Sequence, residues 1–298
     1  MDLKPETYVY KTAGDCDIKA DVYVPPGAAG PTAAIVHIHG GALIYGSRKG
    51  IDRTQLALYL EAGYTVICID YRLAPETKLP EIIADLQDAF RWVADPGPEL
   101  FSVDPGRIAA VGHSAGGYLA LTSGCSVAPR PRAIVSFYGY GDIVGDWYGK
   151  PDPFYCKQPA VSEEESGRHV RGPVISEMYE GRGKEKFYLY CRQNGLWPLE
   201  VSGHDPDEEP SFFVPYSPAR NVTADYPPVL LLHGDRDTDV PYDLSVMMER
   251  ELSRHGVRHE LVTMAGRGHG FDHEMDDSQV IDAFGKVLAF LDEQLKGE

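Results

Sequence analysis

Ser114 is the residue whose surroundings in the sequence most clearly indicate covalent chemistry. It lies in the pentapeptide GHSAG (112–116), which follows the mostly apolar residues 107–111 and leads into a helical pattern over 115–125. A sharp turn from a strand into a helix leaves no room for side chains two residues before and two residues after its central serine, and glycines meet that condition. The turn also aims the hydroxyl away from the sheet. The pattern therefore predicts a nucleophilic serine at the end of a strand.

A second glycine motif offers groups that could stabilise negative charge. Gly40 and Gly41 follow the apolar run 33–39, so the backbone there can approach a ligand closely and present free N–H groups. The N–H of Ala115, at the start of the helix behind the serine, would face the same charge. We therefore predict an oxyanion hole formed by Gly40, Gly41 and Ala115. The alternative for the glycine pair is a tight turn that merely needs glycine.

A serine hydroxyl needs a base to take its proton and an acid to orient that base. In a doubly wound sheet both come from later strand ends, in the order serine, acid, histidine. Asp235, Asp237 and Asp239 directly follow a buried apolar run, so each is a candidate for the acid. His269 lies in a glycine-rich loop between the last predicted strand and the last predicted helix. It is the predicted base, and His273 is the second choice.

Metal and cofactor chemistry has less support in the sequence. His37 and His39 share one face of a strand, but no third ligand of fitting spacing accompanies them. The aspartates after residue 234 resemble the start of a calcium-binding loop, yet Val240 and Val246 stand where that loop needs glycine and a bidentate glutamate. Five scattered cysteines without a CxxC pair indicate reduced structural thiols. We expect no metal and no organic cofactor.

The elements that must position these residues alternate along the chain. Continuous apolar runs predict strands buried on both faces at 33–39, 64–70, 107–112, 132–139, 228–234 and 259–264. Helical patterns occupy 52–62, 81–94, 115–125, 241–255 and 277–295. Two earlier segments, 7–12 and 17–24, alternate polar and apolar residues as an antiparallel edge hairpin would. The alternation predicts an α/β fold, with a mostly parallel central sheet and helices on both of its faces.

One long interval breaks the alternation. Residues 138–226 are rich in proline, glycine and acidic residues, yet they hold 15 of the 31 aromatic residues. Loops of this length are either functional or disordered, and disorder disfavours aromatic residues. We therefore predict a cap inserted after the sixth strand, containing a helix over 184–194, while 1–137 and 227–298 form the catalytic core. An extra structural subdomain with no role at the site is the alternative.

Composition excludes several classes of protein. With 298 residues, 43% of them hydrophobic and 24% charged, the chain resembles an ordinary globular protein. No apolar run approaches the length of a membrane span, and the first residues lack the pattern of a signal peptide, so we expect a cytoplasmic protein without a membrane partner. A formal net charge of −17 would repel phosphate backbones, so nucleic acid is not expected as a partner. The oligomeric state stays open, a homodimer included.

Six motifs, in order along almost the whole chain, resemble the α/β-hydrolase family and its acetyl-esterase branch, close to the hormone-sensitive-lipase-like carboxylesterases. They are HGGA (39–42), DYRLAPE (70–76), GHSAGG (112–117), SPARNV (217–222), HGDRDTDVP (233–241) and GHGF (268–271). The resemblance implies a triad of Ser114, Asp237 and His269, because the pattern HG-x-x-D-x-x-VP places the family's acid at Asp237. It also implies the oxyanion donors named above. The sequence departs from the family pattern at Ala42, where a third glycine is expected.

Together these residues predict a serine carboxylesterase acting on a small-molecule ester. Ser114 would attack the carbonyl, His269 would take and return the proton, and Asp237 would orient the imidazole. An amidase or aryl-formamidase using the same residues is the nearer alternative, and a non-catalytic ligand-binding protein on the same fold is the more distant one. Aromatic residues of the cap, with Trp147 and Trp197 as candidates, are expected to wall off a pocket for acetyl to butyryl groups.

Overall fold

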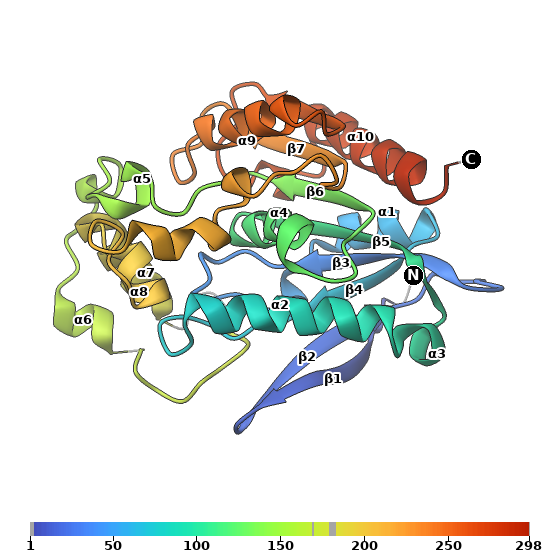
Figure 1. Ribbon diagram of the computed structural model, residues 1–298, viewed down its shortest axis with the longest axis horizontal. Coiled ribbons are helices and arrows are strands. Elements are labelled where there is room, and N and C mark those ends of the chain that lie inside the picture. Colours follow the sequence, from blue (N-terminus) through green and yellow to red (C-terminus); the bar gives the residue numbers. More distant parts are fainter. Residues whose placement is uncertain (1–2, 169, 179–182, 298) are drawn as a thin grey trace.

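The computed structural model describes residues 3–168, 170–178 and 183–297 (Figure 1). Its centre is an eight-stranded sheet in the order β1-β2-β4-β3-β5-β6-β7-β8. β1 pairs with β2 and β2 pairs with β4 in antiparallel orientation, and all other neighbouring strands pair in parallel. The predicted mostly parallel sheet and its edge hairpin are therefore confirmed. The strands are β1 (Glu6–Ala13), β2 (Cys16–Tyr23), β3 (Thr32–Ile38), β4 (Thr65–Ile69), β5 (Val103–His113), β6 (Ala133–Phe137), β7 (Val229–Gly234) and β8 (His259–Met264).

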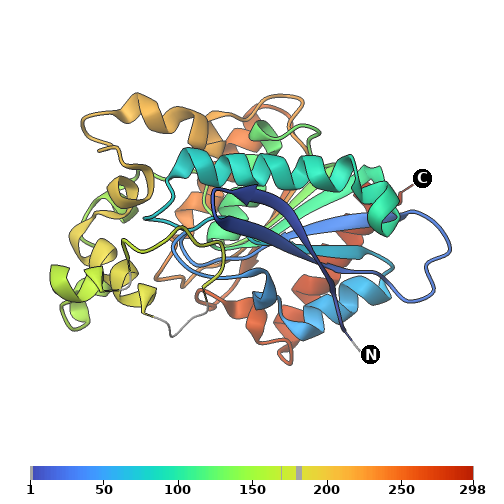
Figure 2. The same cartoon turned by 90° about the horizontal axis from the view of Figure 1, so that it is seen from below.

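Helices cover both faces of the sheet, as predicted (Figures 1 and 2). One face packs against α2, α4 and α9, and the other against α1 and α10. Aspartates begin two of these helices: Asp52 accepts the N–H groups of residues 54 and 55, and Asp277 those of residues 279 and 280. The longer helices are α1 (Arg53–Glu61), α2 (Leu79–Ala94), α4 (Ala115–Ser126), α9 (Asp243–Arg254) and α10 (Ser278–Leu295), and α3 (Gly97–Phe101) is a short one that was not predicted.

Burial of the inner strands on both faces explains why their sequences are apolar without interruption. In β4, Val66 and Cys68 pack on the side of α1 and α10, while Ile67 and Ile69 pack on the side of α2 and α4. Successive side chains of a strand point to opposite faces, so a strand covered on both faces needs apolar residues throughout. The prediction that residues 259–264 form a strand buried on both faces was wrong for β8. Of its six residues only Met264 is buried, because β8 is the edge strand of the sheet.

Between β6 and β7 the chain leaves the sheet, and we call residues 138–226 the insertion. The predicted helix over 184–194 is confirmed as α7. The last part of the insertion returns to the core, where η4 contacts α4 and α9. The elements of the insertion are α5 (Asp146–Gly149), η2 (Tyr155–Lys157), α6 (Glu163–Gly167), α7 (Lys184–Asn194), α8 (Trp197–Ser202), η3 (Pro210–Tyr216) and η4 (Pro218–Arg220).

Two buried side chains of the insertion, Lys184 and Trp197, donate hydrogen bonds to the core. Lys184 Nζ donates to the carbonyl oxygen of Ala74 at 2.9 Å and to Glu76 Oε2 at 2.6 Å. Trp197 Nε1 donates to the carbonyl oxygen of Ala42 at 2.9 Å. The insertion therefore reaches the loop that follows β3, where the oxyanion donors are predicted. Within the described part of the chain, no helix combines the length and the apolar character that crossing a membrane requires.

Candidate active site

The turn around Ser114 has the strained geometry that a nucleophile elbow requires. β5 ends at His113 and α4 begins at Ala115, and Ser114 between them has φ 55° and ψ −119°, a conformation that residues other than glycine rarely adopt. A Cβ on Gly112 would lie 2.0 Å from the carbonyl oxygen of Gly116. A Cβ on Gly116 would come equally close to a carbonyl oxygen at the end of β3. Both glycines of the pentapeptide are thus required by close backbone packing.

The predicted acid and base are hydrogen-bonded to each other. His269 Nδ1 lies 2.7 Å from Asp237 Oδ2, and the other carboxylate oxygen of Asp237 accepts the N–H groups of Asp239 and Val240 at 2.8 and 2.9 Å. Of the three candidate aspartates, Asp237 is the one that binds Nδ1. Asp235 instead accepts the N–H of residue 266 at 2.6 Å, which stabilises the loop before His269.

Electrostatics around this pair favour an ionised acid. Burial alone would raise the pKa of Asp237, but hydrogen bonds from His233 and His269 outweigh it and lower the pKa below its ordinary value. Burial alone would lower the pKa of His269, but the hydrogen bond to Asp237 and the charges of Asp239, Asp237 and Asp272 outweigh it and raise the pKa. The carboxylate is therefore charged and suited to stabilise an imidazolium.

A cavity of about 420 Å³ brings the predicted residues together, a volume within the usual range for small-molecule sites. Ser114, His269, Gly40 and Gly41 all line it, and the second-choice base His273 lines it as well. No hydrogen bond joins the described side chains of Ser114 and His269. Catalytic hydrogen bonds are often long without substrate and tighten when it binds, so the shared cavity is the relevant observation.

The predicted oxyanion donors border this cavity next to the serine. A Cβ on Gly40 would lie 3.3 Å from Ser114 Cβ, so the backbone of Gly40 packs directly against Ser114. Gly41 has φ 103° and its carbonyl oxygen accepts the N–H groups of residues 44 and 45, which forms a tight turn. Ala115 is fully buried at the first position of α4, where backbone N–H groups lack partners within the helix.

The expectation that Trp147 and Trp197 wall the pocket was wrong. Neither is among the described residues that line the cavity. Trp197 is fully buried and stacks on Tyr148 at 4.1 Å between ring centroids, and Trp147 also stacks on Tyr148, at 3.6 Å. Their apolar surface serves the internal packing of the insertion. From the insertion, Tyr138 and Met178 line the cavity.

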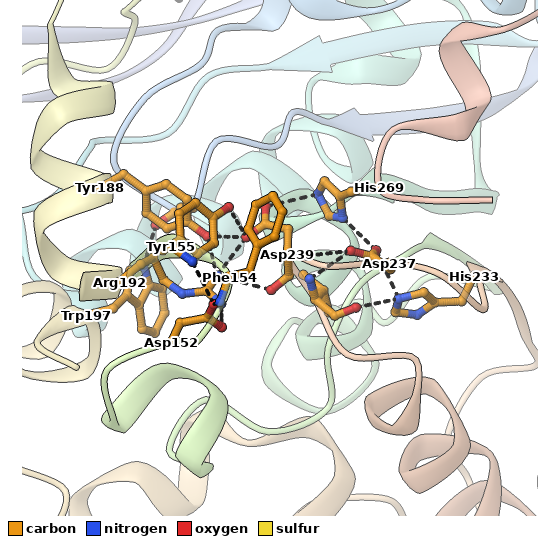
Figure 3. Close-up of polar contacts among 12 residues, drawn as sticks. Asp152, Phe154, Tyr155, Tyr188, Arg192, Trp197, His233, Asp237, Asp239 and His269 are labelled. Atoms are coloured by element: carbon orange, nitrogen blue, oxygen red, sulfur yellow. Dashed lines mark hydrogen bonds and ion pairs between the residues drawn. The ribbon is translucent and has the colours of Figure 1, made fainter. Parts of the chain in front are cut away.

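Three supporting groups of residues were missed by sequence reasoning. His233 Nε2 lies 3.2 Å from Asp237 Oδ2, and its position at the end of β7 was a usable signal. Tyr138 follows β6 directly, packs its ring 4.4 Å from that of His269 and donates to Asp272. Asp239 contacts a cluster from the insertion (Figure 3), which no local pattern in the sequence indicates.

His37 in β3 and His39 directly after it pack against aromatic rings. His37 packs against His113 at 5.1 Å between ring centroids, and His39 stacks on Tyr71 at 4.3 Å. Burial lowers the pKa of both, in His39 to about 4, so both are neutral at physiological pH. Among the residues that the structure describes, no group of three or more His, Cys, Asp or Glu side chains could hold a metal ion.

Family models match two parts of the chain. The BD-FAE model matches residues 20–160, and the model of the prolyl oligopeptidase family matches residues 189–298. Among curated proteins, the chain is 31% identical over 302 residues to the non-reducing polyketide synthase Preu6 of Preussia isomera. That match covers 91% of this chain and 14% of the synthase, so the chain spans about one seventh of the length of this relative.

Solved structures of similar proteins cover nearly the whole chain. One is an esterase of Thermogutta terrifontis, Est2, with propionate bound: 25% identity, a TM-score of 0.70, and 97% and 94% of the two chains covered. The same esterase is known with butyrate bound and phosphonylated by sarin. Another is an α/β-hydrolase superfamily protein of Enterococcus faecalis, with 23% identity, a TM-score of 0.74, and 97% and 98% of the chains covered.

Proposed function

This chain belongs to the α/β-hydrolase family, among its esterases, and we propose that it hydrolyses carboxylic esters of short acyl groups through an acyl-enzyme on Ser114. The observation that carries the proposal is the cavity shared by a strained serine and a hydrogen-bonded Asp–His pair. The esterase Est2, which binds propionate and butyrate, supports the choice of short acyl groups.

In the first half of the reaction, Ser114 Oγ forms a bond to the ester carbonyl carbon while His269 Nε2 takes the hydroxyl proton. The carbonyl oxygen becomes an oxyanion, which the N–H groups of Gly40, Gly41 and Ala115 stabilise. The carbon–oxygen bond to the alcohol then breaks, and His269 gives its proton to the departing oxygen. Asp237 stays ionised and stabilises the imidazolium.

In the second half, water repeats the attack on the acyl-enzyme. His269 takes a proton from the water molecule as its oxygen bonds to the acyl carbon, and then returns a proton to Ser114 Oγ as that bond breaks. A carboxylic acid leaves the cavity and the serine is regenerated. The residues that perform these steps need no redox partner and no co-reactant besides water.

The nucleophile is tested by covalent labelling. A fluorophosphonate probe should label the wild-type protein on Ser114, and Ser114→Ala should abolish the labelling and reduce ester hydrolysis by about a millionfold. The esterase Est2 is phosphonylated by sarin, which supports this choice of probe. Labelling that persists in Ser114→Ala would refute Ser114 as the nucleophile.

The acyl specificity is tested with p-nitrophenyl esters from acetate to palmitate. Each methylene that the pocket accepts contributes about 0.8 kcal/mol, so kcat/KM should rise over the first carbons and fall once the acyl chain meets the cavity wall. A maximum at long chains would favour a lipase. Hydrolysis of an anilide at a rate close to that of the matched ester would favour the amidase or aryl-formamidase alternative.

The cytoplasm is the location that we propose. All five cysteines are free, as is usual for proteins of reducing compartments. Fractionation of cells that express the protein, with thiol alkylation before lysis, tests this location. Recovery in an oxidising compartment would refute it.

A further inference from the structure

The carboxylate of Asp239 lies in the cavity wall, and its two oxygens have different surroundings (Figure 3). Oδ1 accepts three hydrogen bonds from the insertion: from the hydroxyls of Tyr155 at 2.8 Å and Tyr188 at 2.6 Å, and from the guanidinium of Arg192 at 2.6 Å. Oδ2 faces His269 Nε2 at 3.6 Å. No hydrogen bond to Oδ2 is found among the described residues, and the side chain is 21% exposed.

Arg192 fixes this carboxylate in one orientation. Its side chain is only 1% exposed, and it also donates to Asp152 Oδ2 at 2.6 Å and to the backbone carbonyl of Asp239 at 3.1 Å. The guanidinium carbon lies 5.0 Å from the ring centroid of Tyr148 and 4.5 Å from that of Tyr155. Rotating the carboxylate would leave buried donors without an acceptor, which is costly. Asp239 Oδ2 is therefore a preorganised acceptor that the insertion presents to the cavity.

The distance from Asp239 Oδ2 to His269 indicates that Oδ2 can reach the alcohol part of the substrate. His269 Nε2 must come within hydrogen-bond reach of the departing oxygen, so that oxygen and Asp239 Oδ2 lie within about 7 Å of each other. A hydroxyl on the carbon next to the ester-bearing carbon stands about 3 Å from the ester oxygen in a gauche rotamer. A hydrogen bond of about 2.8 Å from that hydroxyl spans the rest of the gap.

We propose that Asp239 selects esters whose alcohol carries a hydroxyl group on the carbon adjacent to the ester, as partial esters of diols, glycerol and sugars do. The proposal rests on the proposed esterase activity. A hydroxyl suits the site better than an ammonium group, because His269 becomes a cation during the reaction and Lys49 lines the same cavity. An ether oxygen at the same place has no proton to donate and would meet the carboxylate as a second acceptor.

Three acetates with leaving groups of similar size test the selection: 2-hydroxyethyl, 2-methoxyethyl and protonated 2-(dimethylamino)ethyl acetate. The wild-type protein should hydrolyse the hydroxyethyl ester with kcat/KM about tenfold or more above the methoxyethyl ester, because a hydrogen bond to a charged acceptor is lost in the latter. The ammonium ester should fall below the hydroxyethyl ester. Equal values for hydroxyethyl and methoxyethyl esters would overturn the proposal, and so would a preference for the ammonium ester.

Asp239→Asn replaces the hydrogen-bond acceptor that faces the cavity with a hydrogen-bond donor. The three donors that hold Oδ1 require an acceptor, so the amide oxygen takes that place and the amide NH₂ faces the cavity. The preference for the hydroxyethyl ester should then vanish or turn toward the methoxyethyl ester, which accepts from an NH₂. Asp152→Asn is the matched control, because it removes the other charge on Arg192 without reaching the cavity, and it should keep the wild-type ratio.

The outcomes separate this proposal from the esterase proposal. A protein that turns over acetates but keeps the same ester ratio in Asp239→Asn refutes only the role of Asp239. Absence of any hydrolysis together with absence of probe labelling on Ser114 refutes the esterase activity itself. Because the ester comparison is made on the wild-type protein, the proposal stays testable even where Asp239→Asn folds poorly.

Discussion

The turn around Ser114 and the insertion meet at one cavity, but different forces hold them there. At the turn, backbone atoms pack so closely that Gly112 and Gly116 leave no space for a methyl group. The insertion packs into the same apolar core as the sheet and is also held by buried charges, with Lys184 on Glu76 and Arg192 on Asp239. Steric packing fixes an atom within tenths of an ångström, while an ion pair depends on its partners being present. Changes at the turn and its acid–base pair should therefore affect the chemistry, and changes in the insertion should affect stability and specificity.

The largest effect expected from the acid–base pair is that of Asp237→Asn. An amide at this position cannot stabilise the imidazolium and favours the wrong tautomer of His269, so kcat should fall by about 10⁴. Asp235→Asn, which affects only a hydrogen bond to the N–H of residue 266, should retain kcat within about tenfold of wild type. Steady-state kinetics on p-nitrophenyl acetate measure both. Similar losses in the two variants would show that the loop needs its aspartates for structure rather than for chemistry.

A substitution in the insertion should lower the free energy of unfolding more clearly than it lowers the rate of the reaction. Arg192→Met removes one partner of a buried ion cluster and leaves two carboxylates without it. Such removal costs about 3–5 kcal/mol when the remaining charge is buried, and the lower end applies because Asp152 and Asp239 are partly exposed. Chemical denaturation measures this loss. Arg168→Met is the control, because Arg168 is exposed and pairs with exposed Glu164, so it should cost less than about 1 kcal/mol.

Substitution of Trp197, which lies where the insertion contacts the loop after β3, should give a smaller effect. Its Nε1 donates to the carbonyl oxygen of Ala42, next to the predicted oxyanion donors. Trp197→Phe leaves that buried carbonyl without its partner, at a cost of about 1–3 kcal/mol, and we expect a several-fold fall in kcat with little change in KM. Trp147→Phe is the matched control, because Trp147 Nε1 has no partner within the described chain. Equal kinetic effects would mean that packing of the insertion, rather than this hydrogen bond, supports the loop.

The same contrast explains what the sequence could predict. Ser114 and its glycines, and the loops after β7 and β8 that carry the aspartates and His269, follow local rules of spacing and turn geometry. The strands and the longer helices of the core lie where periodicity placed them. The partners in the insertion follow no such rule. Arg192 and Asp239 are 47 residues apart and meet only because the insertion folds back over the cavity. The expected roles of Trp147 and Trp197 failed for this reason, since aromatic content predicts a packed subdomain but not which rings face its interior.

The smallest expected effect is a shift in the pH profile of kcat/KM. It tests the comparison because the pKa of His269 depends both on Asp237 in the core and on Asp239, which the insertion holds in place. In the proposed reaction His269 acts as a base only when it is neutral. Its pKa is raised above the ordinary 6.5, so kcat/KM should rise with pH through a value above 6.5. Three acidic groups lie near the imidazole: Asp237 binds Nδ1, Asp239 faces Nε2, and Asp272 accepts a hydrogen bond from the hydroxyl of Tyr138. His273 and Lys49 line the same cavity as the imidazole.

Asp239→Asn removes one of these charges without touching the hydrogen bond of Asp237, so the pKa of His269 should fall and the acidic limb of the profile should move to lower pH. Below neutral pH the variant should then keep a larger fraction of its plateau kcat/KM than the wild type keeps. Asp152→Asn provides the comparison, since Arg192 separates its charge from the imidazole, and its limb should move less. A profile of kcat/KM against pH for the three proteins decides the point. An unmoved limb in Asp239→Asn would show that the insertion presents its carboxylate to the substrate without influencing the base.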